Sequence, residues 1–271
     1  MKTVTAFVGS ARKQHTYHAV RQFLDSLQSF GDVAYEIVRL SDCNVERCRG
    51  CRLCLDKGED LCPCKDDRDL LIDKMMRSDG VVFASPNYSF QVSAIMKTFL
   101  DRLGFAFHRP RFFGKTFTRI VAQGVYGGSK IVKYLDFVGL GLGFNVVKGS
   151  CVTTIEPVTE EAQRKIDGIL AAHSRRFHKQ LLQPPYPAPT LFKLMAFRMA
   201  RTSVRLMLND QWRDYTYYRD NGWFESDFYY PARLNAFKKA AGSLFDYAAR
   251  KWPIGNVPLP RQDASGSSSG D

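Results

Sequence analysis

Hydrophobic and polar positions follow two alternating periods over roughly the first two thirds of the chain. Short apolar, β-branched runs predict buried strands at residues 3–8, 33–40, 80–85, 117–123 and 144–153. Apolar residues at helical spacing predict helices at residues 17–30, 67–77, 92–105, 130–143 and 159–182. Because strands and helices alternate, we expect an α/β fold with a doubly wound, five-stranded parallel sheet that is covered on both faces.

A proline-rich run between residues 183 and 189 ends this alternation. We therefore predict a first domain over residues 1–183, with a cysteine-rich insertion at residues 43–66. A mainly helical, aromatic-rich extension is expected over residues 184–261. The Ser/Gly-rich residues 262–271 have the composition of a disordered tail.

The extension opens with a predicted basic amphipathic helix at residues 191–208. Arg198, Arg201 and Arg205 fall near one face of this helix, and Phe192 and Leu206 fall broadly opposite. Such a helix either lies on an anionic membrane or packs its apolar face on the protein, with the arginines in solvent or paired with acids. We favour the packed helix, because neighbouring aromatic segments also need to be covered.

Charge and composition narrow the class of partner. The chain has 271 residues and a formal net charge of +12. Its basic residues are dispersed without a nucleic-acid-binding motif, so we expect a field that attracts phosphate-bearing cofactors and no nucleic-acid partner. The sequence has no run of 18 uninterrupted apolar residues, so no membrane span is predicted. The opening residues resemble a strand rather than a secretory signal, and we expect a cytoplasmic protein.

Loops that follow the strands are the candidate sites, because open parallel sheets bind ligands at the carboxyl ends of their strands. The loop after the first strand places hydroxyls and cations before a helix N-terminus, which favours a phosphate. An ordinary capped turn has similar residues and is the alternative. The candidate residues of this loop are Ser10, Arg12, Lys13, His15 and Thr16.

Two further loops offer groups for a flat ring at the same edge of the sheet. After the third strand, Tyr88 is suited to stack on a ring and Asn87 to hydrogen-bond its edge, with Pro86 and Ser89 beside them. After the fourth strand, glycines permit close main-chain approach to a planar ligand. The candidates in that loop are Gln123, Gly124, Gly127 and Gly128.

The cysteines form the second candidate site, since five of the seven fall between residues 48 and 64. Such clustering indicates metal or redox chemistry rather than a disulfide framework. Three cysteines spaced three residues apart, followed by another after a short loop, match an iron–sulfur ligand set better than a zinc ribbon. Reduced thiols without a metal are a third alternative. The candidate ligands are Cys48, Cys51, Cys54 and Cys62, with Cys64 as the alternative fourth ligand.

Several motifs together carry a family resemblance. They are Gly9-Ser10-x-Arg12-Lys13, Cys48-x-Gly50-Cys51-x2-Cys54, Ser85-Pro86-x-Tyr88 and Lys97-x-Phe99-x-Asp101-Arg102. From about residue 2 to residue 182 the chain resembles the flavodoxin-like NADPH-dependent FMN reductase superfamily, and within it the iron–sulfur flavoproteins. The resemblance implies a flavodoxin-like fold and a homodimer or homotetramer. It also implies FMN, with its phosphate at Ser10, Arg12 and Thr16 and its ring framed by residues 86–89 and 124–128.

We therefore expect an FMN-dependent oxidoreductase in which a [4Fe-4S] cluster relays electrons to or from FMN. The flavin would carry the chemistry, so no side chain is assigned as acid, base or nucleophile. NAD(P)H or a ferredoxin-like protein would be the electron donor, and a quinone or another small molecule the acceptor. The alternatives are a clusterless NAD(P)H-dependent FMN or quinone reductase, and a zinc-stabilised binding module without redox activity.

Overall fold

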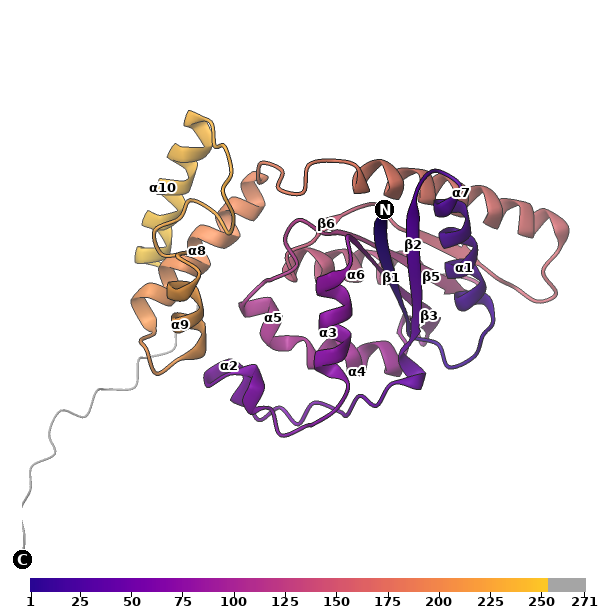
Figure 1. Cartoon of the computed structure of the whole chain (residues 1–271), viewed down its shortest axis with the longest axis horizontal. Helices are drawn as coiled ribbons and strands as arrows, with labels where there is room; N and C mark the ends of the chain where they lie inside the picture. The colour runs from indigo at the N-terminus through magenta and orange to yellow at the C-terminus, as the bar shows by residue number, and fades with distance from the viewer. Residues whose placement is uncertain (253–271) are drawn as a thin grey trace, which may run out of the picture. The chain divides into compact units, whose positions relative to one another are not determined.

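A computed structural model describes residues 1–252 of the chain (Figure 1). The strands are β1 (Lys2–Val8), β2 (Val33–Arg39), β3 (Gly80–Tyr88), β4 (Gln91–Val92), β5 (Thr116–Gln123), β6 (Asn145–Val146) and β7 (Ser150–Thr153). They form one sheet in the order β2-β1-β3-β5-β6, with parallel pairing between neighbours. β7 also pairs in parallel with β5, so β6 and β7 share the fifth position in the sheet. The expected doubly wound parallel α/β fold is confirmed.

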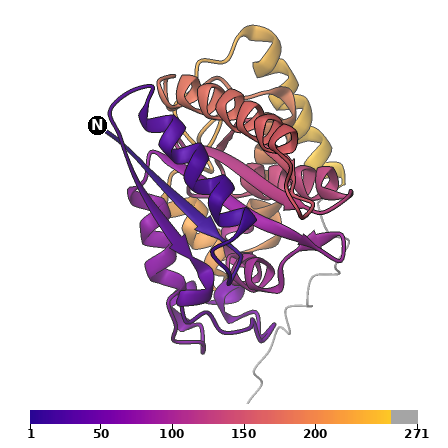
Figure 2. The ribbon, with the colours of Figure 1, turned by 90° about the vertical axis from the view of Figure 1, so that its right-hand side faces the viewer.

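Helices cover both faces of the sheet. The longer helices of the first part of the chain are α1 (His15–Gln28), α3 (Arg68–Arg77), α4 (Ala94–Arg102), α5 (Gly104–His108), α6 (Gly128–Gly141) and α7 (Glu160–Leu181). Short turns of helix are η1 (Leu40–Asp42), α2 (Leu53–Asp56) and η2 (Glu59–Leu61). Figure 2 shows α1 and α7 side by side on one face of the sheet.

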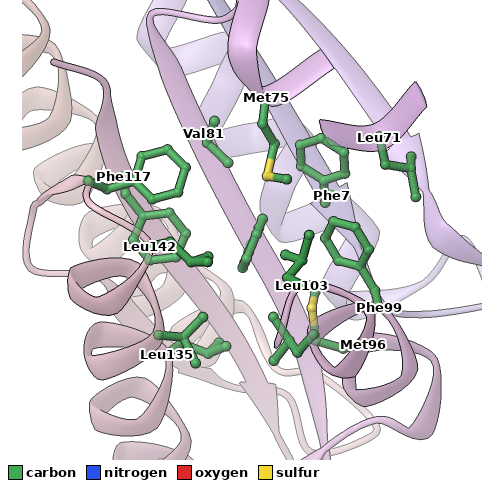
Figure 3. Close-up of a cluster of buried hydrophobic side chains, with 14 of the residues drawn as sticks. Phe7, Leu71, Met75, Val81, Met96, Phe99, Leu103, Phe117, Leu135 and Leu142 are labelled. Carbon is green, nitrogen blue, oxygen red and sulfur yellow. The ribbon is translucent and has the colours of Figure 1, made fainter. Parts of the chain in front are cut away.

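Alternating side chains of the buried strands supply a separate core on each face. Val81 points to the face covered by α3, α4 and α6 (Figure 3), and Phe83 belongs to the same core. Val82 and Ala84 point to the face covered by α1 and α7. Because both faces of β3 are covered, the strand reads as a continuous apolar run rather than an alternating one.

Two strands depart from their predicted limits. β3 does not end before Pro86, because Pro86 still pairs with Ala122 of β5 and the strand turns back at β4. The next helix accordingly starts at Ala94, after an N-cap at Ser93, rather than at residue 92. The predicted fifth strand is interrupted near Gly149, where an added Cβ would lie 2.2 Å from the Arg119 carbonyl oxygen.

The contacts of the chain divide it into two compact units, residues 1–187 and residues from 188 onward. The second unit contains α8 (Leu191–Met207), α9 (Arg213–Asp220) and α10 (Ala236–Lys251), and α8 packs against α10. The predicted tail at residues 262–271 lies outside the described residues. The proposed domain limits at residues 183 and 261 stay a prediction.

In α8, Arg198 and Arg201 face the interior, whereas Phe192 and Leu206 of the predicted apolar face do not. Arg198 is buried and pairs with Asp246 at 2.8 Å and with Asp227 at 2.5 Å. Arg201 also contacts Asp246, at 2.7 Å. Leu194 and Phe197 are buried beside these pairs, while Phe192 and Leu206 are exposed. The expected pairing of arginines with acids is therefore present, but the face that packs is not the one expected.

Asp246 is the shared anion of this interior, and its loss is expected to destabilise the second unit. An Asp246→Asn variant would leave Arg198 and Arg201 short of a buried counter-charge. We expect a loss on the order of 3 kcal/mol in the free energy of unfolding, measured by urea denaturation. Glu225→Gln is the matched control: its pair with Arg205 is exposed on both sides, so the change should stay below about 0.5 kcal/mol. Equal effects of the two variants would contradict this assignment.

A buried histidine joins α7 to the sheet. The Nε2 atom of His173 lies 2.6 Å from Thr118 Oγ1, and its Nδ1 atom lies 2.9 Å from Ser150 Oγ. Its ring packs 4.6 Å from that of Phe23. Burial lowers the pKa of His173 to about 3, and the charges of Arg176 and Arg119 act in the same direction. The imidazole is therefore a neutral structural group in the folded protein.

The depressed pKa of His173 links stability to pH. Above pH 6.5, the ordinary pKa of histidine, His173 is neutral in both the folded and the unfolded chain. Its full contribution to the stability of the folded protein is then present. As the pH falls, the unfolded chain takes up a proton that the folded chain refuses, so stability is lost. We expect the free energy of unfolding to fall as the pH is lowered from about 6 to about 4. The slope of this fall should be steeper in the wild type than in His173→Gln, by up to about 1.4 kcal/mol per pH unit. Parallel curves for the wild type and His173→Gln would refute the assignment.

Candidate functional site

Three loops at the carboxyl ends of the strands converge on one cavity of about 170 Å³. Its lining residues are Ser10, Arg12, Gln14, His15, Thr16, Pro86, Asn87, Tyr88, Ala122, Gln123, Gly124 and Thr154. Nine of the thirteen residues expected for the cofactor are among them. Thr154 was not expected, although the same argument applies to it, because it directly follows β7.

The first loop is fixed by close contact with α4. An added Cβ at Gly9 would lie 2.7 Å from the Cβ of Met96, so only glycine permits this approach. Ser93 Oγ, the N-cap of α4, donates to the Gly9 carbonyl oxygen at 2.5 Å and accepts from the Met96 amide at 3.1 Å. The loop therefore leaves the sheet in one defined direction.

The start of α1 offers this cavity unused donors. The N-cap residue Gln14 makes no side-chain capping bond within the described structure, so the first amides of the helix keep their donors for a ligand. Ser10 and Thr16 are buried beside them, and the exposed Arg12 adds a positive charge. This combination fits an anion such as a phosphate. Lys13 lies over the ring of Tyr17 and does not line the cavity.

Asn87 links the second loop to the third. Its Nδ2 atom donates to the Tyr126 carbonyl oxygen at 2.9 Å. Its Oδ1 atom is buried and has no hydrogen-bond partner among residues 1–252. A buried amide oxygen without a donor carries a free-energy cost, which a ligand N–H group would remove. The site therefore fits a ring that carries such a group on its edge.

The tips of these two loops are strained and aromatic. Ser89 and Phe90 have φ angles of 49° and 63°, which non-glycine residues rarely adopt. The Phe90 ring packs 5.2 Å from the ring of Tyr126, and both side chains are exposed, as is Tyr88. Exposed aromatic side chains thus lie at the tips of the two loops beside the cavity. Ser89 itself does not line the cavity.

Two glycines of the third loop have structural roles that sequence reasoning did not find. Gly127 has a φ of +95°, and an added Cβ would lie 2.8 Å from the Phe90 ring. Gly128 begins α6, and an added Cβ there would lie 2.4 Å from Cys151 Sγ. The Gly128 amide donates to Gln123 Oε1 at 2.7 Å. Gly127 and Gly128 lie outside the cavity lining, and direct cofactor contact by them stays a prediction.

The cysteine-rich segment is a loop closed at its base by two aspartates. The Asn44 amide donates to Asp67 Oδ2 at 2.7 Å, and the Asp67 amide donates back to the Asn44 carbonyl oxygen at 2.9 Å. The Glu46 amide donates to Asp66 Oδ2 at 2.7 Å. These bonds hold the two ends of the loop together, so its cysteines lie on one short closed segment. We call residues 44–67 the cysteine loop.

The thiols differ in exposure along this loop. Cys48 and Cys51 are exposed, Cys54 and Cys62 are partly buried, and Cys64 is buried. Burial raises the pKa of the Cys54 thiol, and the charges of Cys62 and Cys48 raise it further. In the described part of the chain no three such side chains are gathered as metal ligands, so ligation by Cys48, Cys51, Cys54 and Cys62 stays a prediction. As donors, four thiols on one loop suit iron or zinc.

Two buried arginines donate hydrogen bonds to backbone carbonyl oxygens of the cysteine loop. Arg109 is fully buried, donates to the Cys54 carbonyl oxygen at 2.5 Å and pairs with Glu59 at 3.2 Å. Arg68 donates to the Glu59 carbonyl oxygen at 2.8 Å. Both guanidinium groups lie over the ring of Phe105. Sequence reasoning missed these side chains, because an arginine in a helical pattern gives no sign that it will be buried.

Helix α4 joins the two sites. Its N-cap, Ser93, holds the loop at Gly9, while its last residue, Arg102, pairs with Asp66 of the cysteine loop at 3.0 Å. The helix has nine residues, which corresponds to about 13 Å. The cavity and the base of the cysteine loop are therefore held at opposite ends of one short rigid element.

Solved structures with a similar backbone share the fold. A flavone reductase superposes with a TM-score of 0.52 at 16% identity, over 68% of this chain and 65% of that one. RosB, solved with bound 8-demethyl-8-formylriboflavin-5'-phosphate, gives a TM-score of 0.53 at 11% identity, over 100% of both chains. At these identities the likeness extends to the fold alone.

Sequence comparison identifies the family. The family model for NADPH-dependent FMN reductase matches residues 2–156. A protein named iron-sulfur flavoprotein from Archaeoglobus fulgidus is 36% identical over 162 residues, which are 55% of this chain and 71% of the relative. Another of that name, from Clostridioides difficile, is 28% identical over 172 residues, or 61% and 75% of the two chains. The chain is therefore a flavin-dependent oxidoreductase that belongs to the NADPH-dependent FMN reductase family and groups within it with the iron-sulfur flavoproteins.

Proposed function

We propose that this oxidoreductase binds FMN in the three-loop cavity and a [4Fe-4S] cluster on the cysteine loop, and that it relays electrons between them. One observation carries the proposal: the anion-binding cavity and the closed cysteine loop are held at opposite ends of α4. The name of the relatives, iron-sulfur flavoprotein, supports the same pairing of cofactors.

The residues of the cavity would divide the work of holding FMN. Arg12, Ser10, Thr16 and the first amides of α1 would bind the phosphate, and the unpartnered Asn87 Oδ1 would accept a hydrogen bond from the ring edge. A cavity of about 170 Å³ is smaller than a typical cofactor pocket, so the flavin would be only partly enclosed. When bound, FMN supplies both one-electron and two-electron redox chemistry, and no side chain needs to act as a nucleophile.

The cysteine loop would hold the cluster through Cys48, Cys51, Cys54 and Cys62. Cys62 is favoured as the fourth ligand because its side chain, like that of Cys54, is only partly buried. Cys64 is instead buried at the base of the loop. When bound, a cluster of this kind supplies one-electron transfer. The arginines beneath the loop would offset part of its negative charge.

The partners of the reaction follow from the family and the cavity mouth. NADPH is the favoured electron donor because it appears in the family description, and a ferredoxin-like protein is the alternative. Exposed Tyr88, Phe90 and Tyr126 at the mouth suit a flat electron acceptor such as a quinone. We also propose a homodimer or homotetramer in the cytoplasm. None of the helices within residues 1–252 is long and apolar enough to cross a membrane.

A clusterless NAD(P)H-dependent FMN or quinone reductase is the competing function. The cavity supports it equally well, because that site is built without the cysteine loop. Iron content separates the two functions. A zinc-stabilised module without redox activity is not retained, since the chain belongs to a reductase family.

Arg12 provides the test of the FMN site. Arg12→Ala should weaken FMN binding by about 1.5–3 kcal/mol, the value of one charge-assisted hydrogen bond to phosphate. The measurement is fluorescence titration of flavin-depleted protein with FMN, and riboflavin, which lacks the phosphate, should bind both proteins alike. Arg21→Ala is the matched control, because Arg21 is an exposed arginine of α1 outside the cavity lining. If the wild type binds no FMN at micromolar concentration, the proposed site is wrong.

Cys62 and Cys64 form a matched pair for the cluster. Anaerobically purified wild type should contain iron and acid-labile sulfide in near-equal amounts. Cys62→Ala should abolish the cluster, whereas Cys64→Ala should retain it, because only the former removes a proposed ligand. Iron and sulfide analysis with the visible absorption spectrum measures both. Iron-free protein with full reductase activity would instead establish the clusterless function.

A further inference from the structure

The buried pair of Arg102 and Asp66 lies directly beneath the cysteine loop. Their side chains are only 2% and 1% exposed, and Arg102 Nη2 lies 3.0 Å from Asp66 Oδ1. The same Nη2 atom donates to the Cys64 carbonyl oxygen at 3.4 Å. The guanidinium group therefore faces the cysteine loop, although it belongs to α4.

Asp66 is already fully engaged by this arrangement. Its Oδ2 atom accepts from the Glu46 amide at 2.7 Å, and its Oδ1 atom accepts from the Arg68 amide at 3.2 Å as well as from Arg102. The carboxylate thus holds both arms of the loop and has little capacity left for a further donor. Any further hydrogen-bond acceptor for Arg102 must therefore be a group other than Asp66.

Arg102 keeps one donor nitrogen that nothing in residues 1–252 satisfies. Its Nη1 atom is buried and has no hydrogen-bond partner there. A buried charged donor without an acceptor is expensive, so a structure that retains one usually has a ligand that completes it. The two terminal nitrogens share one rigid plane, and Nη2 already points at Cys64 and Asp66. Nη1 therefore lies beside Nη2, close to the segment that carries Cys64.

Of the two neighbouring arginines, Arg68 does not share this feature, and the hydrogen bonds described for Arg109 go to the chain between the cysteines. Arg68 uses Nε and Nη2 on Asp69 and on the Glu59 carbonyl oxygen. Arg109 bonds the carbonyl oxygens of Cys54 and Leu55. These two brace the chain between the cysteines, whereas Arg102 presents an unused cationic donor to a loop whose proposed ligand is rich in anionic sulfur.

We propose that Arg102 is a positioning residue whose Nη1–H group donates a hydrogen bond to an iron-bound sulfur atom, sulfide or thiolate, of the cluster on the cysteine loop, and thereby raises the reduction potential of that cluster. This inference rests on the proposed function. Reduction adds one negative charge to a cluster, so a cationic donor stabilises the reduced form more than the oxidised form. Loss of the donor should make reduction harder.

The experiment compares anaerobic, cluster-loaded wild type with Arg102→Gln. In the wild type, exchange into deuterated water should shift an iron–sulfur stretching band in the resonance Raman spectrum. In Arg102→Gln, that shift should disappear and the cluster potential, from a redox titration followed by electron paramagnetic resonance, should be lower. Iron and sulfide per chain should be unchanged.

Arg119→Gln is the matched control for a purely structural effect. Arg119 is another buried arginine of the same unit, paired with Asp136 and carrying an unsatisfied Nε atom, but it contacts no residue of the cysteine loop among the bonds described. Its replacement should lower the unfolding temperature, yet leave both the deuterium shift and the potential at wild-type values. An equal fall in potential in this variant would overturn the proposal.

Two further outcomes are decisive. An Arg102→Gln protein with full iron, a wild-type potential and a wild-type deuterium shift would show that water or nothing satisfies Nη1, and would overturn this inference alone. Wild type without iron would overturn the proposed function instead. If Arg102→Gln does not keep its cluster, wild type labelled with 15N-arginine decides: a guanidinium nitrogen coupled to the reduced cluster supports the proposal, and its absence refutes it.

Discussion

The contact between Gly9 and α4 is the constraint on which both sites depend. An added Cβ at Gly9 would lie 2.7 Å from the Cβ of Met96, and Ser93 Oγ bonds the Gly9 carbonyl oxygen while it caps the helix. Any side chain at residue 9 would push α4 away from the end of β1. Because Arg102 stands at the other end of that helix, the displacement would reach the base of the cysteine loop as well as the cavity.

The cysteine loop is stabilised in a different way from the rest of the first unit. The sheet and its helices bury two apolar cores, whereas residues 44–67 contain only short helical turns. Val45, Cys54 and Leu55 pack against one core, and polar contacts hold the rest of the loop: aspartates tie its ends, and Arg102 and Arg109 bond its carbonyl oxygens. Buried ion pairs contribute little net stability but strongly penalise alternative arrangements of their partners. Such a loop has a defined base and leaves its outer thiols free of the core.

Hydrophobic periodicity predicted the order of strands and helices, and the rule for parallel sheets predicted which loops would meet. That argument brought Ser10, Asn87 and Gln123 to one cavity although they are far apart in sequence. It failed where pairing partners decide the outcome, as at Pro86, which stays in β3 because β5 runs alongside it. It also missed every buried arginine, since burial of a charge depends on an acid or carbonyl group brought from elsewhere in the chain.

Several of the basic residues that contribute to the net charge of +12 are turned into the protein. In the second unit, Arg198 and Arg201 are turned inward onto Asp246 and present no basic surface. In the first unit, Arg102 and Arg109 bond carbonyl oxygens of the cysteine loop, while Arg12 lines the cavity. In the proposed function, these cations lie near groups that are anionic by chemistry, a phosphate at one end of α4 and thiolates at the other.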